Sequence, residues 1–352
     1  MKSDLDRIRV AVTGLSATDN PYPGLGIIRC LRMAGGFAGK ITALVFDPLS
    51  TGIFCDGLID DVYQVPYPAS GAESLFQRIR EIHEQRPLDV IIPSLDSEVI
   101  LYAELHERLA ALGIRLLLPP PAQVKLRAKH LLYEFGIAHG ITVPETAILN
   151  GPEQVKAKAE EIGIPFVLKA SLNDAAVCSS VEEGEAAYAR LLALWGYPIL
   201  MQRFISGEEF DVIALADRNS RIMGAVAMKK FGLTDKGKAF AGVTIEDTTL
   251  VRRTADILKR LRWVGPAECE FVRDKNGMPY LLEVNSRFPS WLFLAAAAGQ
   301  NLPLMTVRLA MELPVEPLRR YETGKLFIRT VADRLMPSAD LLALAIYGEV
   351  HR

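Results

Sequence analysis

The first 120 residues alternate between short runs of β-branched and aliphatic residues and longer segments with helical periodicity. The three runs are "IRVAVTGL" (8–15), "KITALVFD" (40–47) and "LDVIIPSLD" (88–96), and a loop and a helical pattern follow each of them. Strands that alternate with helices form parallel sheets with helices on their faces. The first third of the chain therefore predicts an α/β domain of Rossmann-like topology.

A proline-rich segment, "LLLPPPAQVKLRAKHLLYEFGI" (116–137), closes this unit. Three successive prolines stop a strand, and Pro121 suits the first turn of a new helix. Beyond this boundary the order of elements becomes α+β. Helices are expected at about 122–136, 152–162, 182–195 and 247–262, and strands at 165–171, 198–204, 209–217 and 221–231.

Charge and cysteine content limit the class of partner. With 40 basic and 42 acidic residues among 352, no global field attracts nucleic acid or an anionic membrane, so we expect small-molecule partners. The apolar run 291–299 is about half the roughly 18 residues that a membrane-spanning helix needs. Four scattered cysteines without CxxC spacing, and a start without a signal-peptide core, predict a cytoplasmic protein.

Polar side chains occupy alternate positions in the segment "YLLEVNSRFP" (280–289). Glu283, Asn285 and Arg287 would share one face of a strand, because side chains alternate between the two faces of a sheet. The preceding strand, "AECEFV", and the turn "DKNG" (274–277) complete a hairpin. The opposite face is apolar, which indicates a well-packed strand.

The register of this hairpin decides which carboxylates meet. If the turn pairs Arg273 with Met278, Glu268 lies opposite Glu283, and Glu270 lies diagonal to Glu283 on the same face. Carboxylates that converge in this way suit Mg²⁺, which prefers oxygen ligands. An exposed polar face of a half-solvated sheet is the alternative. A slip of one residue would turn Glu283 away from Glu270.

The hairpin and two further segments, in this order along the chain, resemble the ATP-grasp superfamily. "PFVLKAS" (165–171) is similar to its phosphate-gripping lysine strand, and "LMQRFISGEEFDV" (200–212) to the hinge that holds adenine and ribose. The layout is similar to the halves of the carbamoyl-phosphate synthetase large subunit and to biotin carboxylase. The resemblance implies a Rossmann-like domain at 1–119, an ATP-grasp domain at 120–315 with a small lobe at about 140–200 and a large lobe at about 201–315, and a C-terminal extension at 316–352 that packs on the core.

The resemblance also implies a nucleotide site. Lys129 would lie near the α-phosphate and Lys169 would bridge phosphate oxygens as a catalytic cation, because an ammonium is a compact point charge. Lys129 could equally be a solvated helix residue, whereas Lys169 ends an apolar strand. Glu209 would accept from the ribose hydroxyls, or Glu208 if the loop is shifted by one. Hinge residues implied to bind the nucleotide are Gln202, Arg203, Phe204 and Ile205, with Met201 and Phe204 as candidates to flank the base.

The same family pattern implies a metal site on the hairpin. Glu270, Glu283 and Asn285 would hold Mg²⁺, or Mn²⁺ in its place, on the ATP phosphates. Arg287 would stabilise charge on the transferring phosphoryl group, and its alternative is a surface salt bridge.

Two segments depart from the family pattern or stay ambiguous. The stretch "ASLNDAAVCSSVEEGE" (170–185) has no glycine before Gly184, although the family usually has a glycine- and serine-rich loop there, and Asp174 adds negative charge. Either side-chain donors such as Asn173, Ser179 and Ser180 hold the phosphates or the loop closes differently, so efficient turnover is in question. The segment 228–244, with Lys229, Lys230, Lys236 and Lys238, would receive an acyl phosphate or an anionic substrate, or is a solvated loop.

By resemblance the chain is an ATP-dependent ligase that activates a carboxylate as an acyl phosphate for attack by an amine or similar nucleophile. The implied partners are small-molecule carboxylates and amines, and homodimers are common among relatives. The N-terminal loops "TDNPYPG" (18–24) and "SLDSE" (94–98) would contact substrate or serve as turns and helix caps. Two alternatives are an ATP-binding protein with weak or no turnover and an NAD-dependent enzyme that uses the N-terminal sheet.

Overall fold

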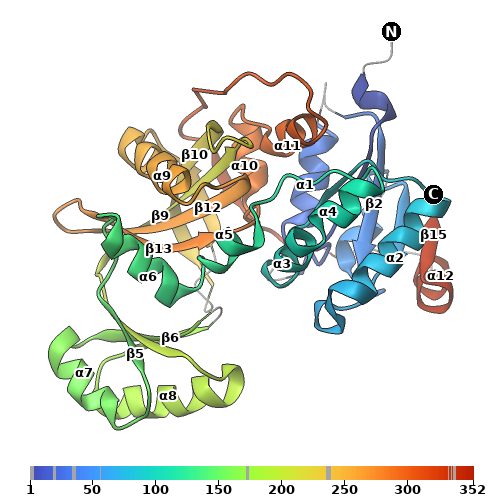
Figure 1. Cartoon of the computed structure of the whole chain (residues 1–352). Coiled ribbons are helices and arrows are strands. Elements are labelled where there is room, and N and C mark those ends of the chain that lie inside the picture. The colour runs from blue at the N-terminus through green and yellow to red at the C-terminus, as the bar shows by residue number, and fades with distance from the viewer. Residues whose placement is uncertain are drawn as a thin grey trace.

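The protein folds around three β-sheets, each with helices packed on it (Figure 1). This computed structural model describes residues 4–18, 21–33, 37–55, 57–171, 174–234, 239–331, 333, 335 and 338–352. Within these residues, no helix combines the length and the apolar character that crossing a bilayer requires.

The N-terminal sheet has the predicted parallel α/β arrangement. Its strand order is β15-β3-β2-β1-β4, and β1 to β4 run parallel while β15 is antiparallel to β3. Two of its strands were not anticipated, because each is only three or four residues long and has no clear apolar run. The strands are β1 (Arg9–Val12), β2 (Lys40–Val45), β3 (Asp61–Gln64), β4 (Val90–Ile92) and β15 (Glu349–His351), and the helices are α1 (Gly24–Leu31), α2 (Gly71–Gln85), α3 (Asp96–Glu104) and α4 (His106–Ala111).

The second sheet is small and antiparallel, with order β5-β8-β6-β7. Phe166, Leu168 and Met201 lie on the face that packs against α7 and α8, and they form the core of this lobe. The alternate residues Lys169 and Gln202 therefore point to the other face of this sheet. Figure 1 shows that this face, opposite α7 and α8, is turned toward the third sheet. The elements are β5 (Thr146–Leu149), β6 (Phe166–Ala170), β7 (Ala175–Cys178), β8 (Ile199–Arg203), α7 (Gln154–Ile162) and α8 (Val181–Trp195).

The third sheet is the largest, with order β13-β12-β9-β10-β11-β14. One face is apolar and packs against α9, through residues such as Val212, Cys269 and Phe271. The neighbours of these residues along each strand point to the opposite face, where the polar residues of the hairpin gather. The elements are β9 (Gly207–Ala216), β10 (Ile222–Leu233), β11 (Ala239–Thr244), β12 (Gly265–Asp274), β13 (Pro279–Asn285), β14 (Leu326–Ile328), α9 (Thr248–Arg260), α10 (Leu292–Ala297) and α11 (Leu302–Ala310).

The helix expected at 122–136 is in fact two helices, α5 (Pro121–Lys125) and α6 (Lys129–Ala138). The prediction of one helix was wrong because the apolar periodicity runs through the break, while Ala128 has an extended backbone with φ −56° and ψ 129°. The break puts Lys129 at the start of α6. Its backbone N–H lies 3.5 Å from the carbonyl oxygen of Ser171, just after β6.

The C-terminal segment contacts two sheets. Strand β14 extends the large sheet, and after α12 (Ala339–Tyr347) the chain adds β15 to the N-terminal sheet (Figure 1). Arg352 donates a 2.7 Å hydrogen bond to the carbonyl oxygen of Ile53. The domain boundaries near 119 and 315 stay predictions.

A buried glutamate fixes the loop that joins β4 to α3. Glu98 Oε1 accepts hydrogen bonds from the backbone N–H groups of Ser94 and Leu95, each at 3.0 Å, and from the hydroxyl of Thr13 at the end of β1. Glu98 thus caps α3, as one reading of the segment "SLDSE" expected. Complete burial raises the pKa of Glu98 to about 7, against the hydrogen bonds that favour its charged form.

This pKa shift predicts a pH dependence of stability. In the unfolded chain Glu98 loses its proton near its ordinary pKa of 4.5, whereas in the fold it keeps the proton up to about pH 7. Between these pH values the folded state binds more protons than the unfolded chain. The contribution of Glu98 to the free energy of unfolding therefore falls as the pH rises through this window. In the parental protein we expect the free energy of unfolding to decline by roughly 1–3 kcal/mol between pH 4.5 and 7 because of Glu98, and we expect Glu98→Gln to remove this decline. Urea unfolding of both proteins across this range measures it, and parallel pH profiles would contradict the assignment.

Candidate active site

The hairpin β12–β13 brings its acidic residues together, but in a different register from the one expected. Glu270 lies opposite Glu283, and Glu268 lies opposite Asn285. The predicted pairing of Glu268 with Glu283 was wrong by two residues. A shift of two leaves every side chain on its expected face, so the four polar residues still share one face of the sheet.

Two local features cause the shift. The carboxylate of Asp274 accepts a 2.8 Å hydrogen bond from the backbone N–H of Met278, which lengthens the turn and pairs Arg273 with Pro279. A β-bulge between Glu270 and Phe271 then adds a second residue to the offset. Each change alone would turn the acidic residues of one strand away from those of the other.

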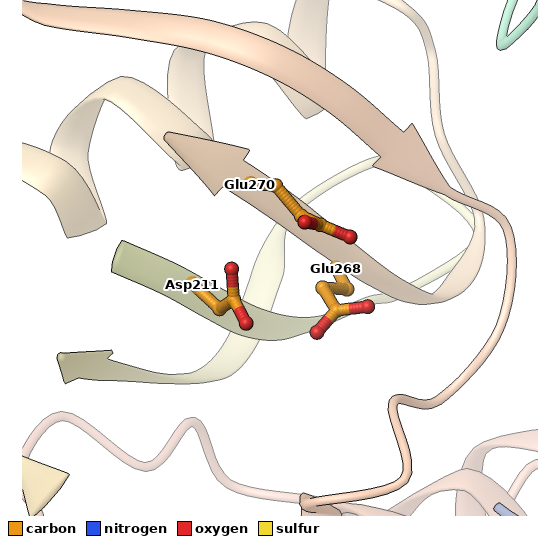
Figure 2. A group of neighbouring side chains, drawn as sticks. All are labelled: Asp211, Glu268 and Glu270. Atoms are coloured by element: carbon orange, nitrogen blue, oxygen red, sulfur yellow. The ribbon is translucent and has the colours of Figure 1, made fainter. Parts of the chain in front are cut away.

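Three carboxylates converge at the centre of this face. Asp211 on β9 joins Glu268 and Glu270 on β12, and each offers an oxygen within 4.8 Å of the other two. Figure 2 shows the three side chains directed into the same space. Asp211 was not anticipated as a site residue. Its signal in the sequence is an acidic residue inside the otherwise apolar strand "FDVIALA".

A lysine lies among these carboxylates. Lys230 Nζ on β10 is 3.0 Å from Glu270 Oε2, 3.1 Å from Asp211 Oδ1 and 3.2 Å from Glu209 Oε2, and the Lys230 side chain is 6% exposed. Burial raises the pKa of Asp211. Burial also acts to raise the pKa of Glu270, but Lys230, together with Arg287 and Asn285, outweighs this effect and lowers that pKa to about 2. Lys230 thus supplies the positive charge that lets Glu270 remain ionised.

Two further lysines approach from other elements. Lys129 at the start of α6 has its Nζ 2.5 Å from Glu283 Oε1, and the side chain is 7% exposed. Lys169 on β6 is also buried, and burial is the main reason that its pKa is lowered. Lys129 lowers this pKa further, whereas Glu283 and Glu270 act to raise it. The charges that act on Lys169 therefore belong to the same cluster. The small and large sheets face each other across these side chains.

Asn285 orients two of the carboxylates. Its Nδ2 donates hydrogen bonds of 3.0 Å to Glu268 Oε2 and 2.9 Å to Glu270 Oε1. In this arrangement the amide oxygen of Asn285 faces away from them, and Glu283 is held by Lys129. The predicted ligand set of Glu270, Glu283 and Asn285 thus overlaps with the converging set of Asp211, Glu268 and Glu270 at one residue.

Arg287 connects the hairpin to the N-terminal domain. Its Nε lies 3.1 Å from Asp96 Oδ2, and its Nη1 lies 3.1 Å from Glu268 Oε2. Asp96 also forms an ion pair with Arg127, with 3.2 Å between Oδ1 and Nη1. Trp291 donates a 2.7 Å hydrogen bond to Glu268. The Arg287 side chain is 17% exposed; its partial burial acts against its charge, but the surrounding carboxylates raise its pKa. Arg287 is therefore not a surface salt bridge.

The hinge exposes one aromatic ring, while the backbone of Gln202 and Arg203 pairs with the neighbouring strands of the small sheet. The side chain of Gln202 donates a 2.9 Å hydrogen bond to Thr146, and that of Arg203 pairs with Glu145 at 2.5 Å. Phe204 is 37% exposed and Ile205 is half-buried. Met201 is fully buried in the core of the small lobe, so in this conformation it does not line the space beside the hinge.

The two hinge glutamates point in opposite directions. Glu209 contacts Lys230 on the acidic face, whereas Glu208 pairs with Lys229 on the other side of the sheet. The strand alternation of β9 accounts for this difference. Of the two candidates for the ribose position, only Glu209 lies on the face that carries the acidic cluster.

The glycine-poor segment 170–185 is anchored to α8. Asp174 accepts from Arg190 at 3.0 Å and from the Trp195 indole at 3.3 Å, so its charge is paired at that helix. The Ser180 hydroxyl caps α8 by accepting from the Glu183 N–H. Asn173, together with Lys236 and Lys238 of the lysine-rich segment, lies outside the described residues.

A cavity of about 260 Å³ adjoins the acidic cluster. Its walls come from the N-terminal loops at 21–23 and 95–97 and from side chains of the large lobe, including Glu268, Arg287 and Trp291. Asp211, Lys230 and Glu270 also line it. The loops that the sequence suggested for substrate contact therefore border the same space as the hairpin.

Comparison with known proteins agrees with this geometry. Residues 197–331 match a family model described as ATP-grasp in the biosynthetic pathway with Ter operon. The biotin carboxylase domain of Hydrogenobacter thermophilus 2-oxoglutarate carboxylase superposes with a TM-score of 0.68 and 17% identity, over 89% of this chain and 71% of that one. The chain has the fold of these ATP-grasp structures, and residues 197–331 match an ATP-grasp family.

Two curated proteins share part of the sequence of this chain. D-alanine–D-alanine ligase of Nitrosospira multiformis is 31% identical over 162 residues, which cover 42% of this chain and 52% of the relative. The arginine-specific carbamoyl phosphate synthase large chain of Geobacillus stearothermophilus is 24% identical over 63% of this chain and 20% of its own length. The matched regions thus span about half of the first relative and a fifth of the second.

The contacts of Asp96 predict a measurable link between the N-terminal domain and the hairpin. Asp96→Asn removes the charge that faces two largely buried guanidinium groups, so we expect a loss of roughly 1–3 kcal/mol in unfolding free energy. The control is Asp256→Asn, which breaks an exposed pair with Arg260 and is expected to cost less than about 1 kcal/mol. Chemical denaturation gives both values, and equal effects would refute a structural role of Asp96.

Proposed function

We propose that this protein is an ATP-dependent ligase that converts a carboxylate into an acyl phosphate, which an amine then attacks. The observation that carries the proposal is the convergence of Lys129, Lys169 and Arg287 on the carboxylate face of the large sheet. Cations from three elements beside hard oxygen ligands form a site for a metal-bound polyphosphate.

The residues present fit a hard divalent cation. Asp211, Glu268 and Glu270 offer convergent oxygens, and carboxylate oxygens are the ligands that Mg²⁺ and Mn²⁺ prefer. Glu270 would be the central ligand, with Glu283 and Asn285 as the further candidates that the sequence pattern gives. When bound, the ion would neutralise charge on the phosphates of the nucleotide.

The protein's own groups would position the reactants. Lys129 and Lys169 would bind phosphate oxygens, and the hinge backbone at 202–205, together with Glu209, would hold the nucleoside. Arg287 is fixed by Asp96 and Glu268, so its guanidinium would be preorganised beside the cavity to stabilise the transferring phosphoryl group. An amine that attacks an acyl phosphate needs no strong base, and we assign none.

The relatives support this reaction class. One curated relative is named a D-alanine–D-alanine ligase, and one structural relative is described in complex with the magnesium salt of ADP and with bicarbonate. Both names are consistent with a carboxylate or bicarbonate as the activated group. The identity of the substrates here is left to experiment.

A second candidate is an ATP-binding protein with weak or no turnover. The observation that favours it is the segment 170–185, where Asp174 is paired with Arg190 and Ser180 caps α8 instead of offering a glycine-rich phosphate loop. Binding of ATP·Mg²⁺ without release of ADP in any substrate pool would support this candidate. A thermal shift with NAD alone would oppose both.

The test is ADP release from ATP with pools of amino acids, dipeptides and bicarbonate. We expect a pool-dependent rate that Lys169→Met lowers at least 100-fold, because removing one preorganised charge costs a few kcal/mol in the transition state. Lys156→Met is the matched control, since Lys156 is exposed on α7 of the same lobe and should keep the parental rate. An equal rate in both variants would refute the phosphate role of Lys169.

A further inference from the structure

Adjacent lysines of β10 have opposite environments. Lys230 is 6% exposed, and its ammonium contacts Glu209, Asp211 and Glu270 on the acidic face. Lys229 is 30% exposed and pairs with Glu208 on the other face. The acidic face therefore holds a built-in cation on two of the same carboxylates, Asp211 and Glu270, that converge with Glu268.

We propose that Lys230 is an internal counter-ion that competes with the divalent cation for Glu270 and Asp211. Lys230 would leave these carboxylates when a metal–nucleotide complex binds, and its ammonium would then pair with phosphate. This inference rests on the proposed function, because it takes the carboxylate face as the metal site. It explains how the site can remain folded without metal, and it predicts that metal binds weakly in the absence of nucleotide.

The electrostatic reason is direct. Asp211 is buried and Glu209 and Glu270 are partly buried, and carboxylates that lie this close repel one another unless a cation neutralises them; Lys230 does so at 3.0 to 3.2 Å. A divalent ion among the same oxygens would stand close to the ammonium, and the two positive charges would repel. Nucleotide phosphates bring new acceptors, which removes this conflict.

The Lys230 side chain borders a cavity into which its ammonium can move. Lys230 lines the 260 Å³ cavity together with Asp211, Glu270 and Arg287. A lysine has a flexible four-carbon stem, so its ammonium can move by several ångströms without a change in the backbone. Lys230 can therefore reach a phosphate at the cavity from its present position on β10.

The experiment measures Mn²⁺ binding to the nucleotide-free protein by water-proton relaxation. Lys230→Met should bind Mn²⁺ at least 10-fold more tightly than the parental chain, which corresponds to about 1.4 kcal/mol. Lys229→Met is the matched control and should bind like the parental chain. Glu270→Gln should abolish tight Mn²⁺ binding, and this loss identifies the Mn²⁺ that is bound at the carboxylate cluster.

A second pair of variants guards against misfolding, because Lys230→Met leaves the buried carboxylate of Asp211 without its cation. The double variant Lys230→Met/Asp211→Asn is compared with Asp211→Asn alone, and the double variant should bind Mn²⁺ more tightly. Circular dichroism and thermal melts establish that each variant is folded. Equal or weaker Mn²⁺ binding after loss of Lys230 in the folded variants overturns the inference.

Titrations with Mn²⁺·ADP separate this inference from the proposed function. We expect the parental chain to bind Mn²⁺·ADP, and Lys230→Met to gain less Mn²⁺ affinity from ADP than the parental chain does. If the parental chain binds Mn²⁺·ADP while removal of Lys230 leaves binding of Mn²⁺ alone unchanged, only the counter-ion role fails. If neither the parental chain nor Lys229→Met binds Mn²⁺·ADP, both the proposed function and the counter-ion role of Lys230 fail.

Discussion

The arrangement of the site depends on how its buried negative charge is neutralised. Glu209, Asp211, Glu268, Glu270 and Glu283 crowd one face of the large sheet; Asp211 and Glu268 are buried and the other three are partly buried, so cations must offset their mutual repulsion. The balancing cations come from outside the hairpin: Lys230 from a neighbouring strand, Lys129 from α6 and Lys169 from the small lobe. Because Lys169 belongs to the small lobe, its charge and those of the hairpin carboxylates act on one another across the two lobes.

Arg287 pairs with carboxylates of both the hairpin and the N-terminal domain. It contacts Glu268 on one side and Asp96 on the other, and Asp96 stands in a loop that Glu98 fixes from within the domain. A guanidinium with five donors in a planar fork can serve two carboxylates at once, which a lysine ammonium does with less directional control. The cavity beside Arg287 is therefore bordered by two domains whose relative position this residue helps to set.

Much of the fold could be predicted from local patterns. Alternating strand and helix signals predicted the parallel sheet, and the order of the lysine strand, hinge and acidic hairpin indicated the ATP-grasp arrangement that the comparisons bear out. Short strands such as β3 were missed because three or four residues carry too little periodicity. The break between α5 and α6 was missed because the apolar pattern continues through it.

The sequence by itself determined which face of each strand is polar, because side chains alternate with a period of two and the apolar positions must be buried. Only the tertiary structure decided which charges meet. The pairing of Glu270 with Glu283 depends on a bulge and on the side chain of Asp274, and the position of Lys230 among the carboxylates depends on the order of three strands, β12, β9 and β10. Such contacts join residues far apart in sequence, so no local periodicity encodes them.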